Sequence, residues 1–283
     1  MRHTSYEKWR KSRLDNYPCG VEKLRVDIAG LHNLSGAERA SISAVVRQFN
    51  MCIYRCRDTE SDRLAVREFA SALGLNRPDL HLCANDDGVS ELCVAHEGVR
   101  TEYVPYSNRA LSWHTDGYYN APSHRVRSVV LHCAADAASG GENALLDPDI
   151  VYIRLRDEDP RFITAFEHPR CMTIPANEGP QGEIRPEVTG PVFSYEKEGH
   201  IHMRYSARKK NIRWRGDALT HAAREFLSSI LAETGGPVFH YRLKPGEGLI
   251  SNNVLHNRTA FEDAAGSRRF LYRARFFDRT GTG

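Results

Sequence analysis

The pattern of apolar and polar positions divides the chain into a helical beginning and a remainder rich in short strands. A capping box at Ser35–Glu38 opens an apolar-periodic segment that ends at Phe49. A second segment with helical spacing starts at Thr59–Asp62 and stops at Gly74. We therefore expect two N-terminal helices over about 35–74.

From Val89 onward the apolar runs become short, β-branched or aromatic, and are bounded by Gly, Pro, Asn or Asp, which is typical of strands. The predicted strands are 90–95, 125–134, 192–195, 200–205, 238–243, 248–251 and 269–277. Asp147-Pro148 opens a helix to about Arg156, and Gly216–Glu233 is predicted as an amphipathic helix.

These elements indicate a β-rich α+β fold. Strands and helices do not alternate regularly, and no glycine-rich phosphate loop follows a strand, which argues against a Rossmann fold. A double-sheet jelly roll, the double-stranded β-helix, flanked by helices fits better. We expect its core over about 88–277, interrupted by a helical insert over about 147–235.

Composition is consistent with one folded domain over residues 1–283. The chain is 41% hydrophobic and 27% charged, and we find no internal repeat and no long Pro/Gly/Ser linker. The longest weakly polar run, 129–138, contains His132 and Asp136 and is far shorter than the roughly 20 residues of a membrane span. A transmembrane helix is therefore excluded.

Charge and cysteine usage exclude further classes of protein. Thirty-nine basic against 36 acidic residues give a net charge of +3, too small an excess to indicate a polyanionic partner. The seven cysteines are scattered without a C-x-x-C pair, so we expect reduced thiols. The basic N-terminus is followed by no apolar signal segment, and we expect a cytoplasmic protein. A homo-oligomer is compatible with the sequence, which does not fix the oligomeric state.

The first segment with recognisable chemistry is Leu111–Tyr119. If it is extended, the side chains of His114 and Asp116 leave the same face, so an imidazole and a carboxylate can hold one metal ion. A His-x-Asp tripeptide is weak evidence alone, because the chain has 13 histidines and 36 acidic residues. A third ligand is needed.

The second segment is Gly246–Phe261, in which His256 follows a predicted strand and turn. It lies 140 residues after Asp116, so only a closed β fold brings it back to the first pair. Two histidines and one carboxylate leave three coordination positions open, an arrangement favoured by non-haem Fe(II) oxygenases. Alone, His256 is equally explained as a turn histidine that is hydrogen-bonded to backbone.

The third segment, Gly266–Phe277, carries several arginines. On a strand Arg269, Leu271 and Arg273 share one face, so two guanidiniums point the same way. Guanidiniums bind carboxylates with two parallel hydrogen bonds, which indicates a small anion near the metal. A solvated edge strand is the alternative, because charged edges resist aggregation.

Together the three segments resemble the TauD/TfdA-like family of Fe(II)- and 2-oxoglutarate-dependent dioxygenases, related to clavaminate synthase and γ-butyrobetaine hydroxylase. Trp113–Asp116 is similar to the family's proximal metal motif, Gly140–Asn143 to its Gly-Gly turn, Asn253–Phe261 to its distal histidine segment and Arg268–Arg273 to its arginine strand. The similarity in order and approximate spacing extends from about Tyr103 to Phe277.

The resemblance implies roles for individual residues. His114, Asp116 and His256 would be the iron ligands, Arg269 would bind the distal carboxylate of 2-oxoglutarate, and Asn143 stands where the family commonly has a threonine that helps hold this cosubstrate. The implied reaction uses Fe(II), 2-oxoglutarate and O2 to oxidise, usually to hydroxylate, an unactivated C–H bond, releasing succinate and CO2.

The substrate is expected to be a small anionic or zwitterionic metabolite. Arg273, Tyr118 and Tyr103 are the candidate substrate-binding residues, and other tyrosines lie in segments expected to flank the iron: Tyr106, Tyr119, Tyr195 and Tyr205. Such tyrosines can surround a cationic group or pack in the core.

Other activities remain as alternatives. The basic stretch 204–215 can contact phosphates, but we do not expect a nucleic-acid substrate, because the interval between Asp116 and His256 is much longer than in nucleic-acid dealkylases of this chemistry. A zinc hydrolase with the same ligands and a catalytically silent binding module also remain open.

Overall fold

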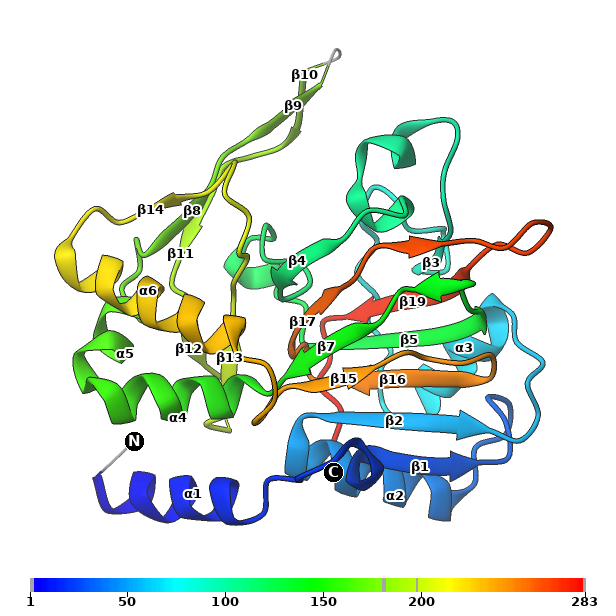
Figure 1. Ribbon diagram of the computed structural model, residues 1–283, viewed down its shortest axis with the longest axis horizontal. Helices are drawn as coiled ribbons and strands as arrows, with labels where there is room; N and C mark the ends of the chain where they lie inside the picture. Colours follow the sequence, from blue (N-terminus) through cyan, green and yellow to red (C-terminus); the bar gives the residue numbers. More distant parts are fainter. Residues whose placement is uncertain (1–2, 180–181, 197, 282–283) are drawn as a thin grey trace.

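The computed structural model describes residues 3–179, 182–196 and 198–281, and its centre consists of two β-sheets with helices outside them (Figure 1). The large sheet has the order β1-β2-β16-β5-β19-β3. In that order its strands are Arg25–Ile28, Met51–Cys56, Glu247–Ser251, Ser128–Ala135, Phe270–Phe276 and Val89–Leu92. β1 and β2 are parallel, and all other neighbours in this sheet are antiparallel.

The smaller sheet is antiparallel throughout and has the order β15-β7-β17-β4. Its strands are Phe239–Tyr241, Asn143–Leu146, Leu255–Arg258 and Leu111–His114. Both sheets contribute to one buried cluster, in which Met51 and Leu271 of the large sheet join Leu145 and Phe239 of the smaller one. The sheets therefore pack face to face, with an apolar core between them.

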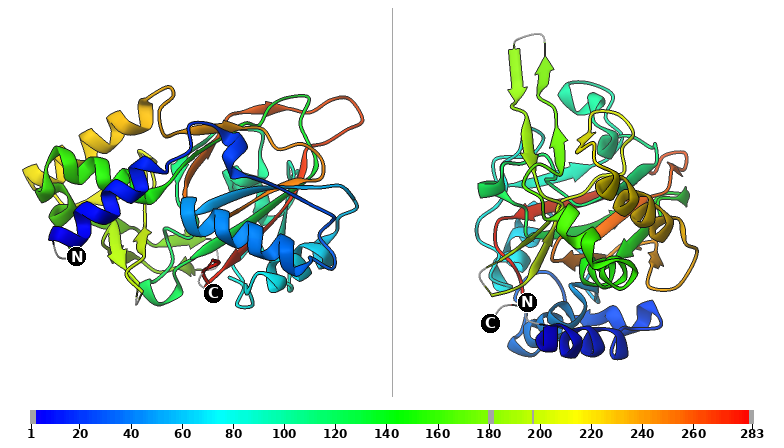
Figure 2. Two further views of the ribbon diagram at one scale, coloured as in Figure 1. Left: turned by 90° about the horizontal axis from the view of Figure 1, so that it is seen from below. Right: turned by 90° about the vertical axis from the view of Figure 1, so that its left-hand side faces the viewer.

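Two helices cover the outer face of the large sheet, α2 (Gly36–Phe49) and α3 (Arg63–Ala72) (Figures 1 and 2). The predicted capping box is present, since the Ser35 side chain accepts from the Glu38 N–H while the Glu38 carboxylate accepts from the Ser35 N–H. Their apolar faces bury side chains against the sheet. The two predicted N-terminal helices are thus confirmed.

The segment between β7 and β15 forms a separate layer beside the sheets. Its helices are α4 (Pro148–Glu158), α5 (Pro160–Phe166) and α6 (Ala218–Ala232). Its strands are β8 Met172–Ile174, β9 Asn177–Gly179, β10 Gly182–Arg185, β11 Val188–Gly190, β12 Phe193–Tyr195, β13 Ile201–Met203 and β14 Arg213–Trp214. The β9–β10 hairpin projects away from the body of the molecule (Figures 1 and 2).

The first helix of the chain, α1 (His3–Asp15), lies against α4 (Figure 2). Tyr6 and Trp9 pack on the ring of Tyr152, and Arg10 donates from Nη2 to Asp157 at 2.7 Å. The short strands β6 (Ser139–Gly140) and β18 (Phe261–Glu262) form a separate pair, and short 3₁₀ turns complete the described chain. No helix among the described residues has the length and apolarity needed to cross a bilayer.

Mixed α/β content with many strands agrees with the sequence analysis, but three local predictions need correction. α1 was not predicted, because its few apolar residues are dispersed among charged ones and gain their burial from α4. β1 and β2 precede the predicted start of the core at about residue 88, yet β2 pairs with β16. The described part of the predicted helical insert also contains seven short strands. Two of them, β12 and β13, confirm the predicted strands 192–195 and 200–205. The other five, β8 to β11 and β14, were not predicted, because their short runs lack a clear alternation.

Candidate active site

Strand pairing brings the three predicted metal ligands together. His256 of β17 is the direct cross-strand partner of His114 of β4, and Asp116 follows His114 by two residues in the turn after β4. Directly opposed residues of antiparallel strands have neighbouring side chains. Pairing of β17 with β4 therefore brings together Asp116 and His256, which lie 140 positions apart in the sequence.

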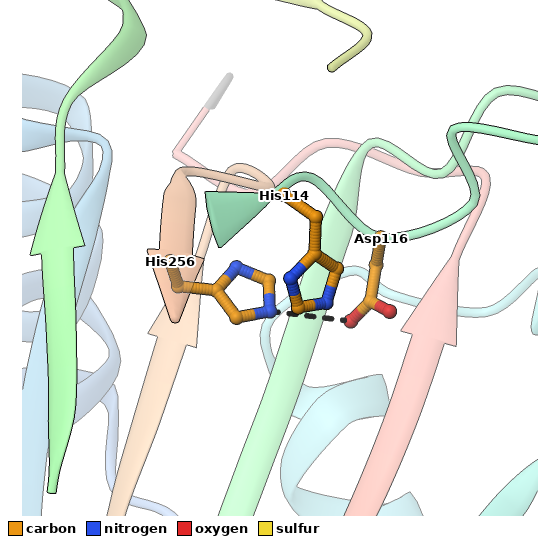
Figure 3. A group of neighbouring side chains, drawn as sticks. All are labelled: His114, Asp116 and His256. Carbon is orange, nitrogen blue, oxygen red and sulfur yellow. Dashed lines mark ion pairs between the residues drawn. The ribbon is translucent and has the colours of Figure 1, made fainter. Parts of the chain in front are cut away.

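The ligand atoms of these residues converge on one point, as Figure 3 shows. One ligand atom from each of His114, Asp116 and His256 lies within 4.8 Å of the others. The two imidazole rings have centroids 4.3 Å apart, and Nε2 of His256 is 4.0 Å from Oδ2 of Asp116. Two nitrogens and one oxygen at this spacing suit a divalent cation.

Backbone carbonyls orient both imidazoles in the same way. Nδ1 of His114 is 2.8 Å from the Ser112 carbonyl oxygen, and Nδ1 of His256 is 2.9 Å from that of Val254. When Nδ1 donates its proton to a carbonyl, Nε2 keeps a free lone pair for a metal. Burial lowers the pKa of His114 to about 3, with a further contribution from His256, so its ring is neutral as a ligand must be.

Asp116 is buried, yet it remains ionised. Burial raises its pKa, but the guanidiniums of Arg273 and Arg275, together with the two imidazoles, hold it below the usual range. Its Oδ1 accepts from Nη1 of Arg273 at 3.4 Å, whereas its Oδ2 is buried without a hydrogen-bond partner. A buried carboxylate oxygen without a partner, facing two imidazoles, fits a divalent metal ion.

Asn253 fixes the backbone that carries Asp116, a role the sequence analysis missed. Its Oδ1 accepts from the Asp116 N–H at 2.7 Å, and its Nδ2 donates to the carbonyls of Asp116 at 2.9 Å and Val126 at 2.7 Å. Asn253 has a positive φ of 52°, a conformation that asparagine tolerates better than most residues. The Asn252-Asn253 pair between two strands was the available turn signal.

Arg275 was also missed, although it shares the strand face of Arg269 and Arg273. Its Nη1 donates to the Tyr119 hydroxyl at 2.8 Å and lies 3.6 Å from Oδ1 of Asp116. The same alternation that identified the other two arginines was the available signal. Arg273 and Arg275 on β19, with Arg269 directly before the strand, therefore form a row of three buried guanidiniums.

A small pocket contains Arg269 and Asn143, the residues that the resemblance assigns to the cosubstrate. Both are buried and line this pocket with Arg242, Gly141 and other residues. Within the described chain the Arg269 guanidinium has no hydrogen bond or ion pair and stacks over a ring, with its carbon 5.0 Å from the Phe261 centroid. A buried guanidinium without an acid fits a carboxylate ligand.

The Gly140-Gly141 turn keeps this pocket open. Gly140 has a φ of +68°, and a Cβ there would lie 2.0 Å from the Ala260 carbonyl oxygen. Gly141 has a φ of +71°, and a Cβ there would lie 3.3 Å from Nε of Arg269. Glycine at both positions permits the turn and the close approach of Arg269.

The tyrosines expected near the metal are divided between the site and the packing layers. The Tyr118 ring lies 6.4 Å from the His114 ring, and the Tyr103 hydroxyl accepts from Nδ2 of Asn177 in β9 at 3.5 Å. Tyr205 is part of the buried cluster beneath α4 to α6, and Tyr195 is hydrogen-bonded there to Tyr152. The last two are therefore packing residues, which is one of the two roles that the sequence left open for these tyrosines.

Comparisons with known proteins agree on one family. Residues 12–275 match the model described as "Taurine catabolism dioxygenase TauD, TfdA family". A "Uridine-5'-phosphate dioxygenase" from Streptomyces sp is 29% identical over 223 residues, which cover 74% of this chain and 78% of that protein. One of the same name from Amycolatopsis sp is 29% identical over 171 residues, which cover 57% of this chain and only 59% of that protein.

Solved structures show the same fold at low identity. The non-heme iron oxygenase OrfP, solved with Fe, succinate and (3S)-hydroxy-L-Arg, has a TM-score of 0.65 and 15% identity, covering 89% of this chain and 86% of that one. Asparagine oxygenase with Fe(II), hydroxyasparagine and succinate has a TM-score of 0.61 and 17% identity, with coverage of 87% and 81%.

Proposed function

The chain belongs to the TauD/TfdA family of dioxygenases, whose model matches residues 12–275, and from this premise we propose that His114, Asp116 and His256 hold Fe(II) and that Arg269 binds 2-oxoglutarate. The observation that supports the assignment is the convergence of three ligand atoms within 4.8 Å, one of them a buried carboxylate oxygen without another partner. Family membership favours an oxygenase over the zinc hydrolase and the binding module.

Fe(II) with 2-oxoglutarate and O2 supplies an oxidant for an unactivated C–H bond, with succinate and CO2 as co-products. The residues of this chain bind and orient the cosubstrate and the substrate. The planar fork of Arg269 holds the distal carboxylate of 2-oxoglutarate, with the Asn143 amide as a second donor. Arg273, four residues after Arg269 and roughly 13 Å away along an extended chain, lies against Asp116 and meets the substrate. Burial of His114 and Asp116 keeps bulk water from the reacting atoms.

For the substrate we propose a small anionic metabolite, with a nucleoside 5'-phosphate as the first candidate. Two relatives are named uridine-5'-phosphate dioxygenases. Arg208 is exposed and donates from Nη1 to the Tyr118 hydroxyl at 3.2 Å, so guanidiniums from Arg208 and Arg273 flank the loop next to His114. Guanidiniums suit phosphate oxygens, and Tyr118 and Tyr103 offer ring surfaces for a base.

A nucleic acid is not the proposed substrate. Several cations of the basic stretch 204–215 already have partners: Arg204 is buried and donates to four carbonyls, Arg213 pairs with Glu187, and Arg215 pairs with Asp217. A stretch that binds a phosphate backbone needs free cations.

We also propose that residues 1–283 form a single oxygenase domain and that the two packed sheets are the halves of a double-stranded β-helix. The antiparallel neighbours of β16, β5 and β19, facing an antiparallel second sheet, support this assignment. A cytoplasmic location and a homo-oligomer remain predictions.

Two experiments test the proposal. Anaerobic addition of 2-oxoglutarate to the Fe(II)-loaded protein should give a weak visible charge-transfer band, which His256→Ala should lack. Uridine 5'-phosphate and a panel of other anionic metabolites are then supplied with O2, while succinate and product mass are measured together, because uncoupled turnover also yields succinate. No band would contradict the metal assignment. A charge-transfer band without oxidation of any nucleotide would contradict only the proposal that the substrate is a nucleoside 5'-phosphate.

A further inference from the structure

Arg275 is the largest of the fully buried side chains, with 2% of its surface exposed. Its guanidinium joins β19 to two other segments of the chain, one with Asp79 and one with Asp116 and Tyr119. Nη2 lies 2.6 Å from Oδ2 of Asp79, Nη1 donates to the Tyr119 hydroxyl at 2.8 Å, and Nη1 is 3.6 Å from Oδ1 of Asp116. Burying a charge this deeply is costly unless it has partners, so the arrangement calls for a specific reason.

The two oxygens of Asp116 have different surroundings. Oδ1 faces two cations, since Arg273 donates to it at 3.4 Å and Arg275 lies 3.6 Å away. Oδ2 has no hydrogen-bond partner and is 4.0 Å from Nε2 of His256. The carboxylate is therefore held by one oxygen, while the other is directed at the two imidazoles.

We propose that Arg275, with its charge balanced by Asp79, is a positioning residue that fixes the Asp116 carboxylate so that Oδ2 alone binds the metal. The inference rests on the proposed metal site of His114, Asp116 and His256. Groups that hold a metal-binding carboxylate from outside tune both its orientation and the affinity of the site.

Charge balance explains the presence of Asp79. The formal charges of Asp79, Asp116, Arg273 and Arg275 sum to zero. Without Asp79, a buried cation 3.6 Å from the ligand carboxylate would be uncompensated and would oppose the binding of a divalent ion. Asp79 is itself held, because its N–H donates to the Arg275 carbonyl at 2.8 Å and Nδ2 of Asn120 is 3.4 Å from its Oδ2.

The geometry requires arginine at this position. A planar guanidinium spreads its charge over two terminal nitrogens, so Nη1 donates to Tyr119 and lies near Asp116 while Nη2 lies within ion-pair distance of Asp79. A lysine ammonium keeps the charge but is a single point on a flexible stem. Because Tyr119 is three residues after Asp116, one guanidinium also fixes both ends of the turn that carries the ligand.

Metal affinity tests the inference without use of turnover. Mn(II) is titrated into the metal-free full-length protein by calorimetry, for the parent and for Arg275→Lys, Asp79→Asn and Asp116→Ala. We expect Arg275→Lys and Asp79→Asn to weaken Mn(II) binding by about 10–100-fold, the range for partners of metal ligands. Asp116→Ala should abolish binding. Arg13→Lys is the control, since it changes another ion-paired arginine, which is partly buried at the α1–α4 contact with Asp149, and should leave the affinity within about twofold.

The possible results distinguish a failure of the proposed role of Arg275 from a failure of the proposed metal site. A parent protein that binds no Mn(II) overturns the metal site itself. A parent that binds, with folded Arg275→Lys and Asp79→Asn variants of unchanged affinity, overturns only the positioning role of Arg275. If Arg275→Lys does not fold, Asp79→Asn decides, because it preserves side-chain volume and removes only the balancing charge.

Discussion

The side chain of Asn253 is hydrogen-bonded to both the N–H and the carbonyl of Asp116, 137 residues earlier in the chain. Replacing Asn253 by Ala removes these two bonds and a third to Val126. We expect the free energy of unfolding to fall by about 4 kcal/mol in urea titrations, since each of the three buried bonds contributes roughly 1 kcal/mol and alanine at a positive φ of 52° costs about 1 kcal/mol more.

Asn211→Ala is the control for this variant. Asn211 is exposed and has a φ of 61°, so the substitution carries only the backbone cost of about 1 kcal/mol for a left-handed residue. Equal losses for the two variants would mean that the side chain of Asn253 contributes nothing through Asp116.

We expect Arg269 to strengthen the binding of 2-oxoglutarate and to lower the stability of the fold. Burial lowers the pKa of Arg269, and its guanidinium lacks an acid, so Arg269→Leu should leave the melting temperature unchanged or higher. The same variant should bind 2-oxoglutarate about 30-fold more weakly or worse, equivalent to at least about 2 kcal/mol for a buried charge partner. Calorimetric titration and thermal scans measure both. Arg269→Lys keeps the charge but not the two parallel donors, so its affinity for 2-oxoglutarate should lie between those of the parent and Arg269→Leu. If Arg269→Leu binds 2-oxoglutarate as tightly as the parent, Arg269 is not a cosubstrate-binding residue.

His256→Ala should separate metal binding from folding. The ring is partly exposed, and its Nδ1 is hydrogen-bonded to Val254, so we expect only a small loss of stability in the metal-free protein. Mn(II) at 100 times its dissociation constant stabilises the parent by about 2.7 kcal/mol. At roughly 2–4 °C per kcal/mol this is a rise of about 5–10 °C in melting temperature. The variant should show no rise, and a chelator should reverse the rise in the parent.

The buried carboxylate Asp147 predicts a dependence of stability on pH. Burial and the neighbouring Asp149 raise the pKa of Asp147 to about 7, against about 4 in an unfolded chain. The folded state therefore binds this proton more tightly, and the stabilisation is complete below about pH 4 and is lost as the pH rises to 7. Asp147→Asn keeps the cap acceptor of α4, so its stability relative to the parent should increase over that window, by at most about 1.4 kcal/mol per pH unit.

Asp217→Asn is the control, because the pKa of Asp217 is shifted in the opposite direction to that of Asp147. Asp217 caps α6, and hydrogen bonds from Thr220 lower the pKa of its carboxyl group. Its contribution is present above about pH 4 and is lost only as the pH falls further. Urea unfolding at several pH values should therefore give Asp217→Asn a constant difference from the parent between pH 5 and 7, and a slope like that of Asp147→Asn would contradict the assignment.

The sequence was informative where periodicity and chemistry coincided. Ser35–Glu38 predicted the start of α2 because a capping box is a local signal. The ligand set followed from the short spacing of His114 and Asp116 and from the resemblance of the distal segment. Alternation predicted Arg269 and Arg273 on one face, and both side chains are buried, Arg273 on β19 and Arg269 directly before it.

The features that the sequence did not predict depend on tertiary contacts. The run Met51–Cys56 is apolar, but its place in the large sheet depends on pairing with β16, about 200 residues later. The role of Asn253 depends on where the backbone of Asp116 lies, which no local spacing encodes. Asp79 became meaningful only once its ion pair with Arg275 was known.

Helix α1 has a practical consequence for anyone who shortens this protein. A version beginning at residue 12, where the family match starts, would lack Tyr6, Trp9 and Arg10. The face of the Tyr152 ring that Tyr6 and Trp9 cover would then meet water, and Asp157 would lose its ion pair with Arg10. Such a trimmed protein should express poorly or aggregate, so boundaries for crystallisation or a purification tag are best placed ahead of residue 3.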